Sequence, residues 1–339
     1  MKKNFLVVIS GCILLFVLLG VLTMTQKKDG VQQTVEQNYV NEKGLIRTYG
    51  KAQHVEVLSE SIGQYMAYLL LIKDEKTFQE QSELLQEHFL VKKKEDVFIK
   101  WQLGATVSTN ASIDDLRIIR TLKEGSRIFH QPEYAELAQK LEKSLIDHQL
   151  TNGILTDFYD WELGEESREV HLSYIDFAAF KEMPAIDETK YVQMLQGAVE
   201  EQTPFFKEVW QIETQTFAPA SEKEVNLIDQ LLIAIQYVKG KKEKPAAFDQ
   251  WLKNEWQTQQ KIFGQYQRNH IVPNVSYESS AVYALAVQYF LATGEESFAE
   301  EIEHTLLEQP PFDVAHDYGS VHFFDYILAQ TAAEQMKQR

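Results

Sequence analysis

Residues 68–89 read YLLLIKDEKTFQEQSELLQEHF and change from apolar to charged to amphipathic along their length. The apolar first part predicts a buried helix face, and the group Lys-Asp-Glu-Lys predicts a turn. After Phe78 the apolar residues recur at three- and four-residue spacing, which is typical of an amphipathic helix. The stretch therefore predicts a helical hairpin in which Phe78 packs the two helices together.

Similar units recur along the chain. QYFLATGEESFAEEIEHTLLEQ (residues 288–309) repeats the pattern, and residues 119–145 and 233–256 are looser copies. Hairpins of this kind cannot bury their apolar faces alone and must stack. Units begin near Val55, Ile113, Tyr174, Leu227, Ser279 and Val321. We therefore expect an all-α fold, an (α/α)6 barrel, with an open superhelical array for protein binding as the alternative.

The composition limits the partners that the protein can have. The chain has 339 residues, of which 50 are acidic and 33 basic, and its net charge is −17. This charge repels nucleic acid and suits a neutral or cationic ligand. The single cysteine, Cys12, excludes disulfides and thiolate metal sites in the rest of the chain. The nine histidines show no His-x-His or His-x-x-x-His spacing, so we expect no metal site.

The N-terminus predicts attachment to a membrane. Phe5 to Met24 is uncharged and has about the length of a membrane-spanning helix, and the two lysines before it predict a cytoplasmic N-terminus. We favour an uncleaved anchor over residues 1–25. A cleaved signal peptide remains an alternative, and Ile9 to Cys12 resembles a lipobox. Residues 26–43 are expected to form a polar stalk or first helix, and residues 44–339 the barrel, outside the membrane.

Polar clusters stand where the inner helices are expected to begin. They are Ser59-Glu60, residues 110–115, residues 171–174, residues 226–229 and residues 276–279. In a closed ring these clusters would converge on one mouth of the barrel. Taken singly, each also fits an ordinary helix cap, as Ser59-Glu60 does.

Four of these clusters, in order, resemble motifs of glycoside hydrolase family 8, namely S-E-G-x-x-Y, A-[ST]-D-x-D-L, P-S-Y and Y-D-A-x-R. The matching stretches are LSESIGQYM (58–66), NASIDDLRIIRTL (110–122), HLSYIDFAAF (171–180) and NLIDQLLIAI (226–235). The resemblance covers the chain from about Gly44 onward. Within this family the chain most resembles membrane-anchored hydrolases of Gram-positive exopolysaccharide operons, which act in biofilm control.

The resemblance implies an (α/α)6 barrel and inverting endo-hydrolysis of a β-linked polysaccharide, with no cofactor. Glu60 would be the general acid, Asp229 the general base, and Asp115 a third catalytic carboxylate that holds the sugar or the water. The residues expected to bind substrate are Tyr65, Trp101, Asp114, Trp161 and Tyr174. The oligomeric state is left open, with a monomer favoured.

The chemistry of an inverting glycosidase fits these positions. It needs two carboxyls about 6.5–9.5 Å apart, one protonated and one charged. Glu60 precedes the apolar run IGQYMAYLLL, and burial there would raise its pKa. Asp229 stands at a predicted helix start, where the helix dipole favours the charged form.

The chain also departs from the family pattern. The first aspartate of the second motif falls on Ile113, and neighbouring Asp114 is the candidate to replace it. Ser61 stands for the glycine, and the arginine of the last motif is absent, since Gln-Leu-Leu follows Asp229. These departures keep open a non-catalytic glycan-binding or assembly protein on the same fold. The hairpin repeat alone would also fit a helical-repeat scaffold.

Overall fold

The computed structural model describes residues 30–50, 56–312 and 317–339. The chain divides into two compact units, with the boundary between Asn38 and Tyr39. The first unit contains α2 (Gly30–Thr34), and η1 (Val35–Tyr39) ends at the boundary. The predicted anchor over residues 1–25 lies outside the described residues. In the ranges that are described, no helix combines the length and apolar character needed to cross a membrane.

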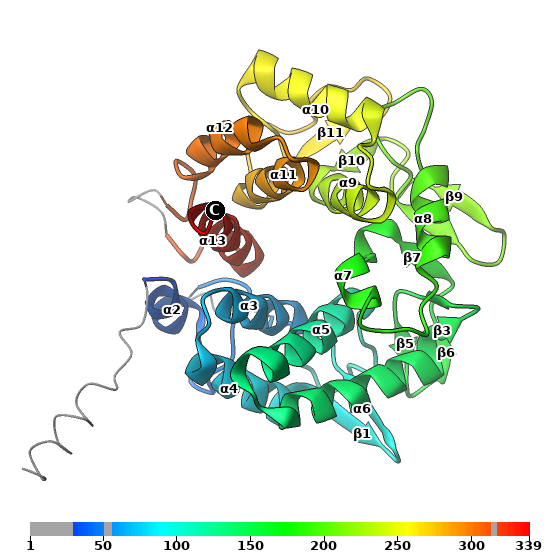
Figure 1. Cartoon of the computed structure of the whole chain (residues 1–339), viewed down its shortest axis with the longest axis vertical. Coiled ribbons are helices and arrows are strands. Elements are labelled where there is room, and N and C mark those ends of the chain that lie inside the picture. Colours follow the sequence, from blue (N-terminus) through cyan, green and yellow to red (C-terminus); the bar gives the residue numbers. More distant parts are fainter. Residues whose placement is uncertain (1–29, 51–55, 313–316) are drawn as a thin grey trace, which may run out of the picture. The chain divides into compact units, whose positions relative to one another are not determined.

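The second unit is built on a ring of inner helical segments. They are α3 (Ser59–Leu71), α5 (Ser112–Phe129), η3 (Leu172–Tyr174) with α7 (Phe177–Phe180), α9 (Leu227–Lys241), α11 (Ser280–Thr293) and α13 (Phe323–Lys337). Successive segments contact one another, and α13 contacts α3, so the ring closes (Figure 1). The closed ring confirms the barrel and argues against the open superhelical array.

Outer helices surround this ring. They are α4 (Glu75–Leu84), continued by η2 (Leu85–Phe89), α6 (Pro132–Gln149), α8 (Glu188–Gly197), α10 (Ala246–Gln259) and α12 (Glu296–Leu306). Three of them, α4, α6 and α12, contact the inner helix that precedes them in the chain. Asp74 caps α4 by accepting a hydrogen bond from the backbone N–H of Thr77 at 3.2 Å. The predicted helical hairpins are thus the building units of the fold.

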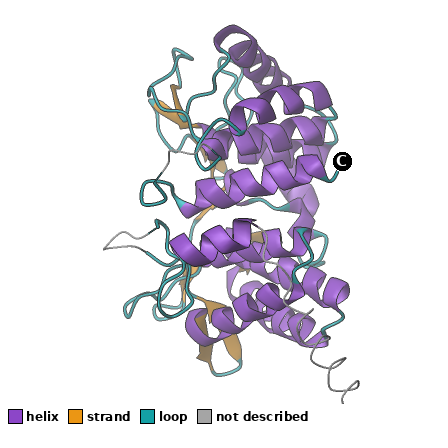
Figure 2. Ribbon diagram, turned by 90° about the vertical axis from the view of Figure 1, so that its left-hand side faces the viewer, coloured by secondary structure: helices purple, strands orange, loops and turns teal. Residues whose placement is uncertain are grey.

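Short antiparallel strands connect the helices. They are β1 (Leu90–Lys93) with β2 (Asp96–Ile99), β3 (Leu150–Thr151) with β4 (Ile154–Leu155), β5 (Tyr159–Asp160) with β6 (Glu165–Glu166), β7 (Glu169–His171) with β8 (Val209–Gln211) and β9 (Thr216–Ala218), and β10 (Glu224–Asn226) with β11 (Gln265–Gln267). Figure 2 shows them on one side of the molecule, where the inner helices begin. The sequence analysis missed these strands because two to four residues are too few to show an alternating pattern.

The third hairpin also differs from its prediction. A full inner helix was expected from about Tyr174, but this place is taken by η3 and the four-residue helix α7. Asp176 caps α7 by accepting hydrogen bonds from the backbone N–H groups of Ala178 and Ala179 at 2.9 and 3.3 Å. Pro184 follows soon after and cannot donate a helical hydrogen bond. The local sequence therefore stops this helix early.

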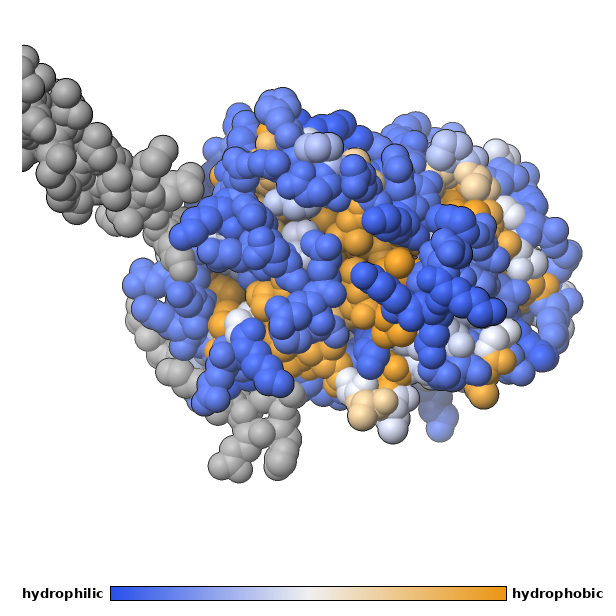
Figure 3. Space-filling model, turned by 90° about the horizontal axis from the view of Figure 1, so that it is seen from below, coloured by the Kyte–Doolittle hydropathy of each residue, from blue (hydrophilic) through white to orange (hydrophobic). Residues whose placement is uncertain are grey.

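The surface reflects the acidic composition. Figure 3 shows hydrophilic residues over most of the face seen from below, with apolar residues grouped between them. Fifty acidic and 33 basic residues supply this polar surface. The charge therefore serves solubility as well as any preference for ligands.

Phe78 of α4 is a core residue, but its ring contacts lie in the second hairpin, on α5 and α6, rather than within its own hairpin as predicted. Its side chain is fully buried, and its ring lies 5.2 Å from that of Phe129 and 5.1 Å from that of Tyr134. Gly125 makes room for it, since a Cβ there would lie 2.7 Å from the Phe78 ring. The corresponding Phe298 is only half-buried and stacks on Phe290 at 5.0 Å. Phe78 thus joins the first hairpin to the second, whereas Phe298 on α12 packs against the inner helix α11 of its own hairpin.

We expect Phe78→Ala to lower the free energy of unfolding by about 3–5 kcal/mol, because it opens a cavity between α4, α5 and α6. Chemical denaturation followed by tryptophan fluorescence measures the change. Phe298→Ala is the matched control and should cost less, since its ring is partly exposed. Equal losses of unfolding free energy in both variants would show that the greater burial of Phe78 does not determine its contribution to stability.

Candidate active site

The inner helices enclose a cavity of about 700 Å³. Residues from both ends of these helices line it, and on α5 they run from Ile113 to Ile128. Two of the predicted catalytic residues, Glu60 and Asp229, are on its wall, together with Tyr174. The structure therefore brings carboxyls from the first turns of α3 and α9 to one cavity.

Glu60 is held in the first turn of α3 by contacts of its neighbour. The Ser59 hydroxyl donates to an Asp114 carboxylate oxygen at 2.8 Å, and the Ser59 backbone N–H donates to the Trp101 carbonyl at 2.9 Å. Burial, reinforced by the negative charge of Asp114, raises the pKa of Glu60 to about 7, while Arg117 opposes the rise. Glu60 can therefore hold a proton near neutral pH.

Asp114 and Arg117 form an ion pair beside Glu60. The Arg117 guanidinium donates to Asp114 at 2.6 Å, and Arg117 itself lines the cavity. Asp114 is buried, and this burial raises its pKa against the opposing effect of Arg117. The pair places one negative and one positive charge close to Glu60. Sequence analysis missed Arg117, although its position three residues after Asp114 puts both on one helix face.

Asp115 points elsewhere. It accepts a hydrogen bond from the Asn110 side-chain amide at 2.6 Å, and the same amide nitrogen lies 2.7 Å from Gln149. The Asn110 side-chain oxygen accepts from the backbone N–H of Tyr159 at 2.7 Å. Successive residues on a helix point about 100° apart, so Asp114 and Asp115 cannot share one direction. The structure places Asp114 beside Glu60, and Asp115 in a buried amide network.

Asp229 lies at the start of α9, whose first turn is capped by the Asn226 side chain accepting from the Ile228 N–H at 2.9 Å. Burial raises the pKa of Asp229, and the buried carboxylate of Glu208 adds to the rise. A hydrogen bond from the Ser173 hydroxyl and the nearby His171 act in the opposite direction. Asp229 is thus a partly buried carboxylate with polar partners on η3 and the strand before it.

The predicted aromatic platforms are dispersed. Tyr174 lines the cavity, and burial raises its pKa to about 12, so it is a neutral hydrogen-bond donor. Trp101 is 38% exposed near the start of α3. Trp161 stacks on Phe98 at 5.3 Å and is not among the cavity residues. The prediction that Tyr65 binds substrate is wrong, because its ring is buried, 3% exposed, and cannot reach a ligand.

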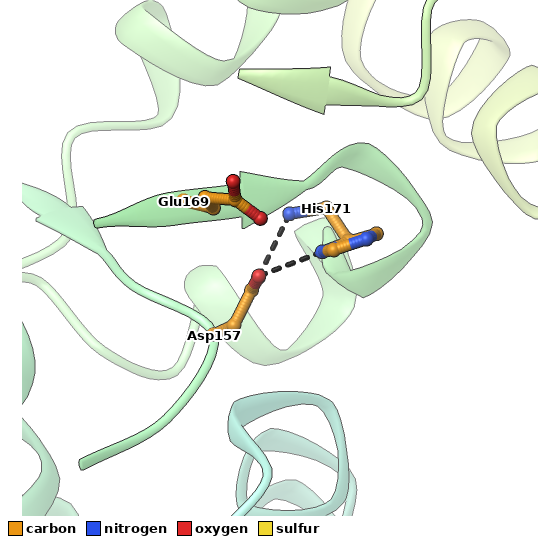
Figure 4. Close-up of side chains that lie close together, drawn as sticks. All are labelled: Asp157, Glu169 and His171. Carbon is orange, nitrogen blue, oxygen red and sulfur yellow. Dashed lines mark hydrogen bonds and ion pairs between the residues drawn. The ribbon is translucent and has the colours of Figure 1, made fainter. Parts of the chain in front are cut away.

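One group among the described residues could hold a metal ion, formed by Asp157, Glu169 and His171 (Figure 4). The Asp157 oxygens accept hydrogen bonds from the His171 backbone N–H at 2.8 Å and from its Nδ1 at 2.7 Å. Glu169 accepts from the Gln211 side chain at 2.7 Å. Protein donors thus already engage both carboxylates. Sequence analysis gave His171 and Asp157 no role, because residues 14 apart in sequence showed no motif.

Replacing Asp114 by Asn is expected to lower the pKa of Glu60 from about 7 toward its ordinary value. One like charge disappears, and Arg117 loses the carboxylate that balances it. Carbon-13 NMR titration of the Glu60 carboxyl, assigned by its loss in Glu60→Gln, measures the shift. Asp147→Asn removes an exposed carboxylate on α6 and should leave the pKa of Glu60 unchanged. An unaltered pKa of Glu60 in Asp114→Asn would show that burial alone raises this pKa.

Two proteins are similar to this chain over most of their length. "Putative lipoprotein YdaJ" of Bacillus subtilis (strain 168) is 34% identical over 268 residues, which cover 77% of this chain and 71% of YdaJ. PssZ from Listeria monocytogenes, known from a crystal structure, is 35% identical with a TM-score of 0.84, covering 92% of this chain and 96% of PssZ. No protein-family model matches the chain.

More distant solved structures share the fold. An alpha-amylase from Clostridium perfringens is 20% identical with a TM-score of 0.78, over 90% of this chain and 96% of its own. Endoglucanase Cel10, a family 8 glycosyl hydrolase from Klebsiella pneumoniae, is 14% identical with a TM-score of 0.65, over 92% of this chain and 100% of its own. These findings confirm the resemblance to glycoside hydrolase family 8. The chain belongs to the same family as YdaJ and PssZ, and it has the (α/α)6 fold of the family 8 glycosyl hydrolases.

Proposed function

We propose that the protein is an inverting endo-glycosidase that cleaves a β-linked exopolysaccharide, with Glu60 as general acid and Asp229 as general base. One observation carries the proposal. Two carboxyls from separate inner helices line the same cavity, and the surroundings of Glu60 raise its pKa to about 7. A protonated and an ionised carboxyl in one cavity are what an inverting glycosidase needs.

Glu60 begins the reaction in this mechanism. Its proton passes to the glycosidic oxygen as the bond from that oxygen to the anomeric carbon breaks, so the leaving sugar departs as a neutral alcohol. The carboxyl must be protonated before this step, which burial and the charge of Asp114 favour. Arg117 balances the charge of Asp114, so the site does not carry two uncompensated carboxylates.

Asp229 activates the water. It accepts a proton as the water oxygen bonds to the anomeric carbon from the face opposite the leaving group, which inverts the anomeric configuration. The Ser173 hydrogen bond orients the carboxylate and favours its charged form. Tyr174, neutral and on the cavity wall, can donate a hydrogen bond to the sugar.

We assign to Asp114 the role of third catalytic carboxylate, which the sequence analysis gave to Asp115. The family motif implies Asp115 for this role, but Asp115 holds Asn110, which in turn holds the backbone at Tyr159. Asp114 lies beside Glu60 and is the one whose charge acts on it. Asp115 therefore supports the backbone at the start of β5, and Asp114 acts on the acid.

The substrate is proposed to be a polysaccharide outside the cell membrane. The fold is shared by endoglucanases and xylanases, which favours β-linked glycans, and by an alpha-amylase, so starch belongs among the test polymers. The net charge of −17 disfavours a polyanionic glycan. The N-terminal apolar run and the description of YdaJ as a lipoprotein support attachment to the membrane.

A non-catalytic glycan-binding role is the second candidate. Ile113 and Leu232 stand where the family motifs carry an aspartate and an arginine, and both apolar side chains line the cavity. Loss of two polar groups that contact substrate would weaken catalysis more than binding. This protein would then hold the polymer during its assembly.

Glu60→Gln and Asp229→Asn are each expected to reduce hydrolysis at least about 100-fold, because each removes a proton transfer. New reducing ends from the host's secreted polysaccharide, β-glucan, xylan and starch measure the activity, and proton NMR of the first product identifies its anomer. Glu124→Gln is the control, since Glu124 lines the cavity about 15 Å further along α5 than Asp114.

The proposal is supported if the wild type and Glu124→Gln both release reducing ends and the two site variants do not. A first product with retained configuration would overturn the inverting mechanism. Saturable binding of a polymer with no release by any variant would favour the glycan-binding role instead.

A further inference from the structure

A second cavity, of about 540 Å³, shares no lining residue with the first. Its lining comes from the β3–β4 hairpin, the outer helix α8, and β8 and β9 with the turn between them. Figure 1 shows α8 beside β9 at the outer edge of the ring. β7, which pairs with β8, leads into η3 at the wall of the first cavity. The second cavity is therefore separate from the proposed active site, but it is built on the sheet that leads to it.

Two aromatic rings form one wall of this second cavity. Trp210 on β8 and Phe217 on β9 are directly paired across the strands, so they point to the same face of the sheet. Their ring centroids lie 4.6 Å apart. Phe217 is held from the side of α8, since a Cβ at Gly197 would lie 2.7 Å from its ring. Both rings are only half-buried, so the cavity has an accessible aromatic wall of fixed orientation.

Uncharged polar groups line the rest of the cavity. Asn152, Gln193 and Gln215 are exposed, and their side-chain amides make no hydrogen bond to any residue that the structure describes. The indole N–H of Trp210 has no partner there either. Each amide offers two donor hydrogens and an acceptor oxygen. Donors and acceptors thus stand around an aromatic surface, available to a ligand.

The charge of the cavity limits the class of ligand. Lys190 is the one charged side chain among the described residues that line it, and its ammonium donates to the backbone carbonyl of Asn152. An anionic ligand calls for uncommitted cations, and a cationic ligand for carboxylates. The lining offers neither. The cavity therefore suits a neutral ligand that has an apolar face and a polar edge.

We propose that this second cavity binds a neutral stretch of a polysaccharide chain, apart from the active site. A sugar ring has C–H groups on its faces and hydroxyls around its edge. The Trp210 and Phe217 rings receive a C–H face, and the three amides bond to the hydroxyls. The inference goes beyond the proposed function and rests on it only for the choice of polymer. A chain held at the second cavity is presented to the first at a raised effective concentration.

The first test observes the second cavity directly. Full-length Glu60→Gln protein, in which the proposed hydrolysis is stopped, is labelled with fluorotryptophan. Fluorine NMR resolves its five tryptophans, and the Trp210 signal is identified by its loss in Trp210→Phe. The probes are cello-, xylo- and malto-oligosaccharides and fragments of the host's secreted polysaccharide. We expect at least one of them to shift the Trp210 signal saturably. A Trp210 signal that none of them moves overturns the proposal.

Matched substitutions test whether the amides make the contacts. Gln193 lines the cavity, whereas Gln196 is exposed on the same helix and does not line it. Gln193→Ala is expected to weaken the binding read at Trp210 by about 2–10-fold, and Gln196→Ala to leave it unchanged. Gln215→Gly should also weaken it without disturbing the turn, because Gln215 has a φ of 53°, which glycine adopts readily. Equal affinity in all three variants overturns the proposal.

Ionic strength tests the class of ligand. Binding of a neutral glycan should be the same at low and high concentrations of sodium chloride, because no charge pair forms. A marked loss of affinity at high salt would show that the ligand is held by charge and would overturn the assignment to a neutral chain.

Kinetics separate this site from the proposed active site. In the otherwise unaltered chain, Trp210→Ala and Gln215→Gly should raise KM for the long polymer severalfold and leave kcat and KM for a short oligosaccharide unchanged. An equal rise for both substrates would place the effect in the first cavity and overturn the separate site. If the wild type hydrolyses nothing, the proposed function fails, and the Trp210 signal still decides the second site. Hydrolysis with an unmoved Trp210 signal supports the proposed function and rejects this inference.

Discussion

The contact between α13 and α3 is the constraint on which the rest of the structure depends, because it turns a row of hairpins into a closed ring. Other bonds reinforce it. The hydroxyl of Tyr39 donates to the Val321 carbonyl at 3.1 Å, and the backbone N–H of Phe323 donates to the Thr48 carbonyl at 2.7 Å. An outer helix returns the chain between successive inner segments, so the inner helices share one direction, and closure brings their starts together at one end. Groups far apart in sequence, such as Glu60 and Asp229, thereby reach one cavity.

Much of this architecture could be predicted from the sequence, because helical hairpins leave a period of apolar residues and an aromatic residue after each turn. Phe78 is buried as that pattern requires. The strands and the shortened third helix could not be foreseen. Strands of two to four residues carry no alternation, and the short span of α7 follows from local features, the Asp176 cap at its start and Pro184 beyond its end.

The site was predicted in position but not in detail. Glu60, Asp229 and Tyr174 line the cavity as expected. Motif alignment could not decide between Asp114 and Asp115, because adjacent helical residues differ only in the direction of their side chains. It also could not show that Tyr65 faces the core, nor find Asp157, whose carboxylate meets His171 fourteen residues further along the chain.

The proposed mechanism requires Glu60 to be protonated and Asp229 to be ionised, and the charges that the fold places next to each carboxyl favour this difference. Burial alone would push Glu60 and Asp229 the same way, toward the protonated form. Asp114 adds to this effect at Glu60, whereas Ser173 and His171 oppose it at Asp229. These neighbours come from α5 on one side and from η3 and the strand before it on the other. The asymmetry needed for acid and base therefore lies in which element adjoins each carboxyl, and the ring closure fixes that choice.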